Sequence, residues 1–141
     1  INLAEFVATF LADRFHGGEQ SGMLAEPIVA AELMAAIAEV SRQYAASFVL
    51  TRGGQSILLA RGGQLRVVAV PPLAASAVVS PIGSGDSFLA GMLAQLLQAS
   101  GTNWDRLSLD SLEDATTLAT ACAQSNARTA RPGFLDDSFR P

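Results

Sequence analysis

Apolar residues at helical spacing predict two helices in the first third of the chain. A helix over residues 3–14 is indicated by apolar residues three to four positions apart, namely Leu3, Phe6, Val7, Phe10 and Leu11. A polar, glycine-rich loop follows over residues 15–22. Pro27 suits the first turn of a second helix that runs to about residue 45, with apolar positions at Ile28, Ala31, Leu33, Met34, Ile37 and Val40.

Short apolar runs bounded by glycine and proline then predict three strands. Residues 47–51 have the pattern of a buried strand. Residues 56–61 and 64–70 flank Gly62-Gly63, which is typical of a hairpin turn. Pro71-Pro72 ends the third strand, because proline cannot donate a hydrogen bond to a neighbouring strand.

Helical spacing returns in the last part of the chain. After a short extended segment over residues 73–79, a helix is predicted to begin after Asp86. Its broad apolar face should hold Phe88, Leu89, Met92, Leu93, Leu96 and Leu97. A last helix is predicted over residues 111–129, and its start at Ser111 and Asp114 resembles a capping box.

The remaining residues of this part are expected to be structural. Trp104 in the connector and Cys122 on the last helix are interpreted as packing residues. Arg131-Pro132-Gly133 breaks the helical pattern, and we expect the polar tail over residues 134–141 to be loose.

The order of elements predicts the fold class. Helix, helix, strand, hairpin, helix, helix is an α/β arrangement, and we expect three layers. The chain holds too few strands for a complete parallel sheet, so partner strands are expected outside this sequence. It begins at Ile1 without Met, which favours a piece of a longer protein. Because a sheet edge and an apolar face would stay uncovered, we expect this chain alone to self-associate or to be unstable without a complementary segment.

Composition and charge exclude several classes of function. A net charge of −4 with no basic run argues against a nucleic-acid partner. All nine basic residues are arginine, which excludes chemistry that needs a lysine of this chain. The only histidine, His16, is given no role, and a histidine triad or histidine-rich metal site is disfavoured. The single Cys122 forms no disulfide framework, so a cytoplasmic location is expected. No apolar window predicts a membrane span, and no signal peptide is visible.

The stretch over residues 82–91, Ile-Gly-Ser-Gly-Asp-Ser-Phe-Leu-Ala-Gly, is the main candidate for chemistry. Glycines allow a tight turn, and the start of a helix leaves N–H groups unpaired at the positive end of its dipole. Together these features predict an anion site. Asp86 has two interpretations: an acid favoured by the helix dipole, or a carboxylate with a role at the anion site. The local pattern favours neither interpretation over the other.

Residues 83–91 closely resemble the G-A-G-D-[ST]-F-x-[AG]-G signature of the ribokinase-like (PfkB) carbohydrate kinases, with Ser84 where alanine is usual. Two further motifs occur in the family's order. Asn2-Leu3-Ala4-Glu5 resembles its N-x-x-E motif, and Thr51-Arg52-Gly53 resembles its S/T-x-G turn, although Ser56 replaces a later glycine. Residues 131–133 resemble its late Pro-Gly turn. Pro71-Pro72, a short connector and then Val-Ser-Pro-Ile-Gly over residues 79–83 look most like the branch of 1-phosphofructokinase and tagatose-6-phosphate kinase.

The resemblance implies a fold and an activity. It implies a three-layer, ribokinase-like (Rossmann-like) sandwich of which this chain is the C-terminal, ATP-binding and catalytic portion over residues 1–141, without the sugar-binding half and its lid. It implies transfer of the γ-phosphoryl group of ATP to a hydroxyl of a sugar or sugar phosphate. Asp86 would be the general base, and Gly83, Ser84 and Gly85 would form an anion hole at the transferred group.

Cofactor roles also follow from the resemblance. Asn2 and Glu5 would hold Mg²⁺, largely through its waters. Their spacing alone favours a helix cap with its capping box, the motif around Asp86 favours the metal role, and the two roles are compatible. Thr51, Arg52 and Gly53 would lie near the nucleotide, and Arg52 would contact a phosphate or remain a solvated turn charge. Pro132 and Gly133 would border the adenine pocket. K⁺ activates many kinases of the family through backbone carbonyls, which leave no side-chain pattern, so a requirement for K⁺ stays open.

Two functions from different classes are therefore predicted for comparison. The first is the catalytic part of a sugar or sugar-phosphate kinase. The alternative is a truncated, non-catalytic fragment or pseudokinase that at most binds nucleotide. A dinucleotide-binding domain ranks below both, because no G-x-G-x-x-G motif follows the first strand.

Overall fold

The computed structural model describes residues 1–15, 29–101 and 103–140, except for the side chain of Arg106. The chain divides into two compact units, Ile1–Val70 and Pro71–Pro141, and each is described by itself. The loop with His16, Pro27 and Ile28 lies outside the described residues, so the expectations for them are not tested.

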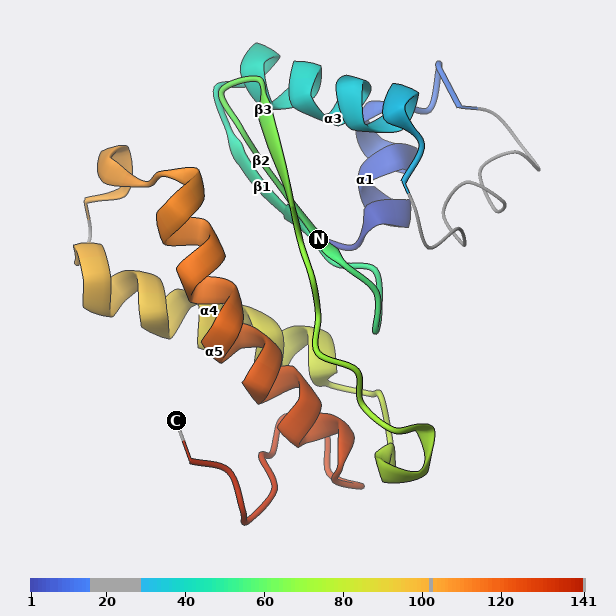
Figure 1. Cartoon of the computed structure of the whole chain (residues 1–141), viewed down its shortest axis with the longest axis vertical. Coiled ribbons are helices and arrows are strands. Elements are labelled where there is room, and N and C mark those ends of the chain that lie inside the picture. Colours follow the sequence, from blue (N-terminus) through green and yellow to red (C-terminus); the bar gives the residue numbers. More distant parts are fainter. Residues whose placement is uncertain (16–28, 102, 141) are drawn as a thin grey trace. The chain divides into compact units, whose positions relative to one another are not determined.

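The first unit is a three-stranded antiparallel sheet with two helices packed against it (Figure 1). In chain order it holds α1 (Leu3–Phe10), α3 (Ala31–Gln43), β1 (Ser47–Leu50), β2 (Ile57–Arg61) and β3 (Gln64–Val68). The sheet order is β1-β2-β3, with Phe48 opposite Ala60 and Ala60 opposite Leu65. The central position of β2 explains why Ile57 to Ala60 are all buried.

The core of this unit forms where α1 and α3 meet one face of the sheet. Its helical members are the predicted apolar positions Leu3, Phe6, Val7, Leu33, Ile37 and Val40, and Leu58 and Ala60 join them from β2. The rings of Phe6, Phe10 and Phe48 contact one another, with centroids 5.0–5.4 Å apart. The helical spacing of apolar residues in the sequence therefore corresponds to a buried stripe on both helices.

Several bounds in this unit differ from prediction. Helix α1 ends at Phe10, and its chain turns there because the N–H groups of Arg14 and Phe15 both donate to the carbonyl of Leu11. Helix α3 ends at Gln43, two residues before Ala45, whose φ of +48° is incompatible with a helix. Ala31 is exposed instead of buried, and β1 is buried only at Leu50.

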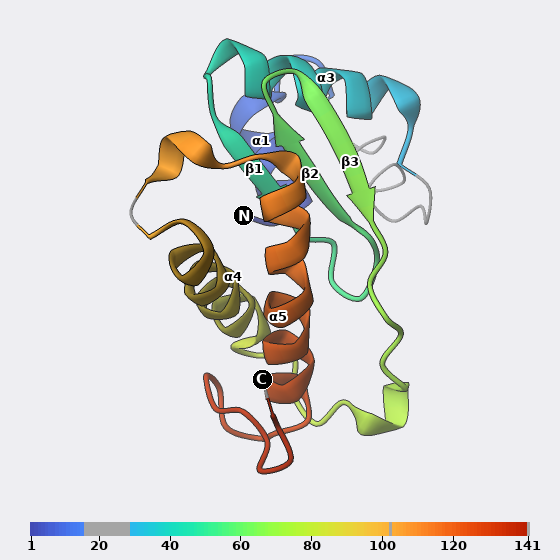
Figure 2. The same cartoon turned by 60° about the vertical axis from the view of Figure 1, so that its left-hand side comes forward.

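The second unit is built on two long helices that pack against each other (Figures 1 and 2). These are α4 (Ser84–Ser100) and α5 (Leu109–Ala127), with the short 3₁₀ helices η1 (Ala75–Ala77) and η2 (Trp104–Arg106) before each of them. The buried contact holds Phe88, Met92, Leu96, Leu112, Ala115, Ala119 and Cys122. A Cβ on Gly91 would lie 2.9 Å from both Ala119 Cα and Cys122 Sγ, so the absence of a side chain lets the helices approach closely.

Four predictions for this unit are wrong in detail. Residues 75–77 form a 3₁₀ turn instead of an extended segment, and α4 begins at Ser84, before Asp86. Helix α5 begins at Leu109, capped by a reciprocal pair between Ser108 and Ser111 in place of Ser111 and Asp114. On α4, the apolar face is split: Phe88, Met92 and Leu96 are buried, whereas Leu89, Leu93 and Leu97 are 42–56% exposed.

The tail after α5 is also more ordered than predicted. The Ser125 hydroxyl donates to a carboxylate oxygen of Asp136 over 3.0 Å, and the Asp136 N–H donates to the same hydroxyl over 2.8 Å.

Trp104 in the connector, which was predicted to be a packing residue, is 42% exposed. Within the described part of the chain, no helix combines the length and the apolar character needed to cross a bilayer.

Candidate active site

The Gly83 turn forms the start of α4. Gly83 is the N-cap, with a φ of +86° that favours glycine, and its carbonyl accepts the first helical hydrogen bond from the Ser87 N–H at 2.9 Å. The Ser84 N–H donates instead to the Pro81 carbonyl, 3.2 Å away. The N–H groups of Gly85 and Asp86 stand before the first helical acceptor, and they are the donors that the helix itself leaves for an anion.

Asp86 is the third residue of α4, so it lies inside the first turn at the positive end of the dipole. Asp86 is exposed, whereas the next two residues, Ser87 and Phe88, are buried and attach the start of the helix to the core. This position satisfies the structural interpretation, an acid favoured by the dipole. It also leaves Asp86 exposed in the same helical turn as the Gly85 and Asp86 N–H groups, as a base at an anion site would require.

The structure brings the Pro132-Gly133 segment against the Gly83 turn. A Cβ built on Gly83 would lie 2.7 Å from the Gly133 nitrogen and 3.0 Å from Pro132 Cα. These are backbone contacts in which no side chain can move aside. Residues that the sequence separates by about fifty positions, and that were predicted to serve the anion and the adenine, are therefore direct neighbours in the second unit.

Asn126 joins these segments and was not predicted. Its side chain is fully buried on α5, and its Nδ2 donates to the carbonyls of Arg131 at 3.2 Å and Phe134 at 2.9 Å. Its Oδ1 accepts a hydrogen bond from the Ser84 hydroxyl over 3.3 Å. The sequence does contain a sign of it, because Asn126 continues the buried spacing of Ala119 and Cys122 with a polar residue.

A second group of predicted residues meets in the first unit. Asn2 forms a parallel bridge with Thr51, in which the Leu3 N–H donates to the Thr51 carbonyl and the Thr51 N–H to the Ile1 carbonyl. Asn2 Oδ1 accepts from the Glu5 N–H at 2.8 Å, and Glu5 Oε2 accepts from the Asn2 N–H at 3.1 Å. The predicted capping box is therefore present, and it holds both polar side chains at the end of β1.

Arg52 and Gly53 lie in the turn that joins β1 to β2. The Arg52 guanidinium donates to the Ser56 hydroxyl at 3.0 Å, and burial lowers the pKa of Arg52. Arg52 is half-buried, so it is not simply a solvated turn charge. Gly53 has a φ of +63° and no atom within 4 Å of a built Cβ, which leaves room for a ligand to approach its backbone.

The described residues offer a sparse set of metal ligands. Among them, no three side chains of histidine, cysteine, aspartate or glutamate gather in one place. Mg²⁺ keeps several waters and takes few protein ligands, so an exposed pair such as Asn2 and Glu5 has the right chemistry for contact through water.

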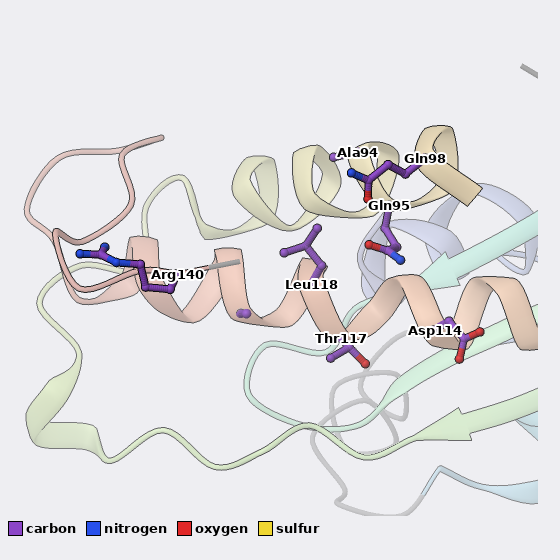
Figure 3. A pocket seen from close by; sticks show the side chains of 8 residues that line it. Ala94, Gln95, Gln98, Asp114, Thr117, Leu118 and Arg140 are labelled. Atoms are coloured by element: carbon purple, nitrogen blue, oxygen red, sulfur yellow. The ribbon is translucent and has the colours of Figure 1, made fainter. Parts of the chain in front are cut away.

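A groove between α4 and α5 holds none of the predicted site residues. In Figure 3, Gln95 on α4 and Leu118 on α5 point into the space between the helices. The groove is lined by Ala94, Gln95, Gln98, Asp114, Thr117, Leu118, Ala121 and Arg140. The lining mixes apolar and polar side chains and includes two residues of opposite charge, Asp114 and Arg140.

Comparison with known proteins decides the family. Residues 19–135 match the model of the pfkB family carbohydrate kinases. The chain belongs to this family. The match spans the Gly83 turn, Asp86 and the Pro132-Gly133 segment, and it begins after Asn2 and Glu5.

Individual relatives are longer than this chain. Adenosine kinase 1 of Arabidopsis thaliana is 32% identical over 68 residues, which are 48% of this chain and 20% of that protein. Two structures of fructokinase from Vibrio cholerae match with a TM-score of 0.57 and 20% identity over 77% of this chain and 32% of theirs. One is a double mutant with fructose, ADP and potassium ion, and the other holds fructose, ADP and calcium ion. The predicted α/β, ribokinase-like fold class is confirmed, and the chain spans a fifth to a third of these relatives.

Proposed function

We propose that this chain is the C-terminal, nucleotide-binding and catalytic portion of a kinase that transfers the γ-phosphoryl group of ATP to a sugar or sugar-phosphate hydroxyl. The observation that carries the proposal is the start of α4, where the exposed Asp86 stands beside two N–H groups within a chain of the pfkB family. The motif details favour the 1-phosphofructokinase and tagatose-6-phosphate kinase branch. The single cysteine favours the cytoplasm.

In this proposal each part of the turn has one task. The substrate hydroxyl oxygen attacks the γ-phosphorus, the bond from the γ-phosphorus to the bridging oxygen of ADP breaks, and the hydroxyl proton moves to the Asp86 carboxylate. The N–H groups of Gly85 and Asp86 stabilise the charge on the transferred group. The sequence predicted an anion hole formed by Gly83, Ser84 and Gly85 together. The Ser84 N–H already donates to the Pro81 carbonyl, so we assign the anion hole to the N–H groups of Gly85 and Asp86.

The remaining predicted residues would serve the nucleotide and its metal. Asn2 and Glu5 would orient waters of Mg²⁺, a task compatible with their capping box because Mg²⁺ retains its waters. Thr51, Arg52 and Gly53 would face the phosphates, and Pro132 and Gly133 would border the adenine. K⁺ belongs to the proposal only as a candidate activator, since one fructokinase of the same fold was solved with it.

A complementary segment would supply the sugar contacts and the rest of the sheet. The chain spans only about a third of the fructokinases that share its fold. Leu89, Leu93 and Leu97 form an exposed apolar row on α4, which supports self-association of the chain when alone. The alternative function is a truncated, non-catalytic fragment or pseudokinase that at most binds nucleotide.

The test compares Asp86→Asn with Asp110→Asn in the complete protein. Asp110 is also an exposed aspartate in a first helical turn of this unit, so it controls for the loss of a charge at a helix start. We expect Asp86→Asn to lower kcat by about 10²–10⁴-fold, as for loss of a general base, with the melting temperature nearly unchanged. ATP consumption is measured over a panel of sugars and sugar phosphates.

Two outcomes would contradict the proposal. If the complete protein phosphorylates no member of the panel, the non-catalytic alternative replaces it. If the protein is active and Asp86→Asn retains the kcat of Asp110→Asn, then Asp86 is only a helix-stabilising acid.

A further inference from the structure

The buried Asn126 connects three segments that come together around the Gly83 turn. Helix α5 ends one residue later, at Ala127, whose carbonyl accepts from the N–H groups of Val79 at 2.8 Å and Ser80 at 3.1 Å. The Asn126 side chain reaches the Ser84 hydroxyl on one side and the carbonyls of Arg131 and Phe134 on the other. The end of α5 thus binds two segments by hydrogen bonds. One leads into the Gly83 turn, and the other, residues 131–134, packs on that turn.

Each atom of the Asn126 amide is used in a way that few side chains can reproduce. The Nδ2 group has two hydrogens and two carbonyl acceptors, and Oδ1 accepts from Ser84. Because the residue is fully buried, water cannot replace a missing partner there. A leucine or alanine would fill space on α5 but would leave the two carbonyls without this donor.

The contact between Gly83 and Gly133 makes this connection matter for the site. The built Cβ of Gly83 would stand only 2.7 Å from the Gly133 nitrogen, so the two backbones lie in direct contact. A displacement of residues 131–134 therefore changes the surroundings of Gly83, and Gly83 sets where α4 begins. The positions of Asp86 and of the Gly85 and Asp86 N–H groups depend on that start.

We propose that Asn126 is a positioning residue, which holds the Pro132-Gly133 segment against the Gly83 turn and thereby sets Asp86 and the adjacent N–H donors in their working geometry. The inference rests on the proposed kinase function for its effect on turnover. It acts through the backbone of both segments, and Asn126 itself contacts no substrate. Ser84, the one departure from the family signature, takes part because its hydroxyl reaches the Asn126 oxygen.

The first experiment compares Asn126→Asp with Asn103→Asp in the complete protein. Asn103 is an exposed asparagine of the same unit, so it controls for the added charge. Asn126→Asp keeps the shape, but the ionised side chain has no donor for the two carbonyls. We expect kcat per folded molecule to fall about 10–100-fold, which is the effect of a small misplacement of reacting groups. Asn103→Asp should retain the parent kcat.

The pH profile separates positioning from a general loss of folded protein. A buried aspartate next to two carbonyl oxygens favours its neutral form, which can donate one hydrogen bond. Part of the lost kcat of Asn126→Asp should therefore return, relative to the parent protein, as the pH is lowered from 8 to 6. An unchanged kcat per folded molecule at pH 8, or a loss independent of pH, would overturn the proposal.

A second measurement needs no substitution and no activity. Amide hydrogen exchange is followed in the unaltered complete protein at low urea concentrations. If one side chain holds both segments, the amides of Val79, Ser84 and Phe134, all hydrogen-bonded here, should open together with the same dependence on urea. Independent opening of Ser84 and Phe134 would refute the connection. Absence of kinase activity would refute the proposed function alone, since the exchange result still decides whether Asn126 links the segments.

Discussion

Replacement of Gly83 by alanine is expected to be among the most destabilising single changes in the second unit. Gly83 has a φ of +86°, a left-handed conformation that costs an L-residue about 1–2 kcal/mol. The added Cβ would also stand 2.7 Å from the Gly133 nitrogen and 3.1 Å from Pro132 Cβ. Overpacking of this kind costs about 1–3 kcal/mol, so the expected loss is about 2–5 kcal/mol.

Gly85→Ala is the matched control because it makes the same chemical change two residues later. No atom lies within 4 Å of a Cβ built on Gly85, and the residue is already within α4. Alanine in a helix is more favourable than glycine by about 0.5–1 kcal/mol, so Gly85→Ala should be neutral or stabilising. The free energies of unfolding of the two variants should therefore differ by about 2–6 kcal/mol, with Gly83→Ala the less stable of the two.

Urea unfolding followed by the circular dichroism of the helices measures both effects. The free energy of unfolding is taken from the midpoint and slope of each curve, and equal slopes show that the two variants unfold from comparable states. The reasoning is refuted if Gly83→Ala lies within about 0.5 kcal/mol of the parent protein, the range of an ordinary surface substitution. In that case neither the backbone conformation nor the contact with Gly133 constrains the turn.

Two further predictions concern the rest of the second unit. Gly91→Ala should destabilise the protein by about 1–3 kcal/mol despite the better helix propensity of alanine. The added Cβ would lie 2.9 Å from Ala119 Cα and from Cys122 Sγ. An unfolding curve that shows a gain in stability would contradict the close packing of α4 on α5. Hydrogen bonds from the Ser138 side chain and backbone, with smaller contributions from Ser125 and Arg128, lower the pKa of Asp136 below its usual 3.8. The ionised Asp136 carboxylate therefore stabilises the fold above pH 3.8, and this stabilisation is lost as the pH falls through the lowered pKa. The difference in melting temperature between the parent protein and Asp136→Asn should be constant near neutral pH and shrink in acid. A difference that stays constant down to pH 2 would disprove this prediction.

The sequence by itself determined the kind and order of the elements. Apolar spacing identified α1, α3 and α4, a last helix was predicted where α5 lies, and Gly62-Gly63 identified the hairpin of β2 and β3. These features are local, since they follow from side-chain periodicity and from the backbone freedom of glycine. The short motif at residues 83–91 also indicated the family, because its adjacent residues closely resemble the family signature.

Contacts between distant residues were decided only by the tertiary structure. Periodicity placed Leu89, Leu93 and Leu97 on an apolar face, but α5 covers only the part of α4 that holds Phe88 and Met92. The bridge between Asn2 and Thr51 likewise joins residues far apart in the chain. A periodic pattern gives the width of an apolar face, whereas the neighbour that covers it depends on packing.

The candidate site shows the same division most clearly. Gly83 and Asp86 could be chosen from sequence because their chemistry depends on a few adjacent residues. For Asn126 the sequence shows only a polar residue at a buried spacing, because its role arises from three segments that meet only after α5 packs on α4. A buried amide gains its meaning from the partners that surround it, and no local pattern encodes those partners.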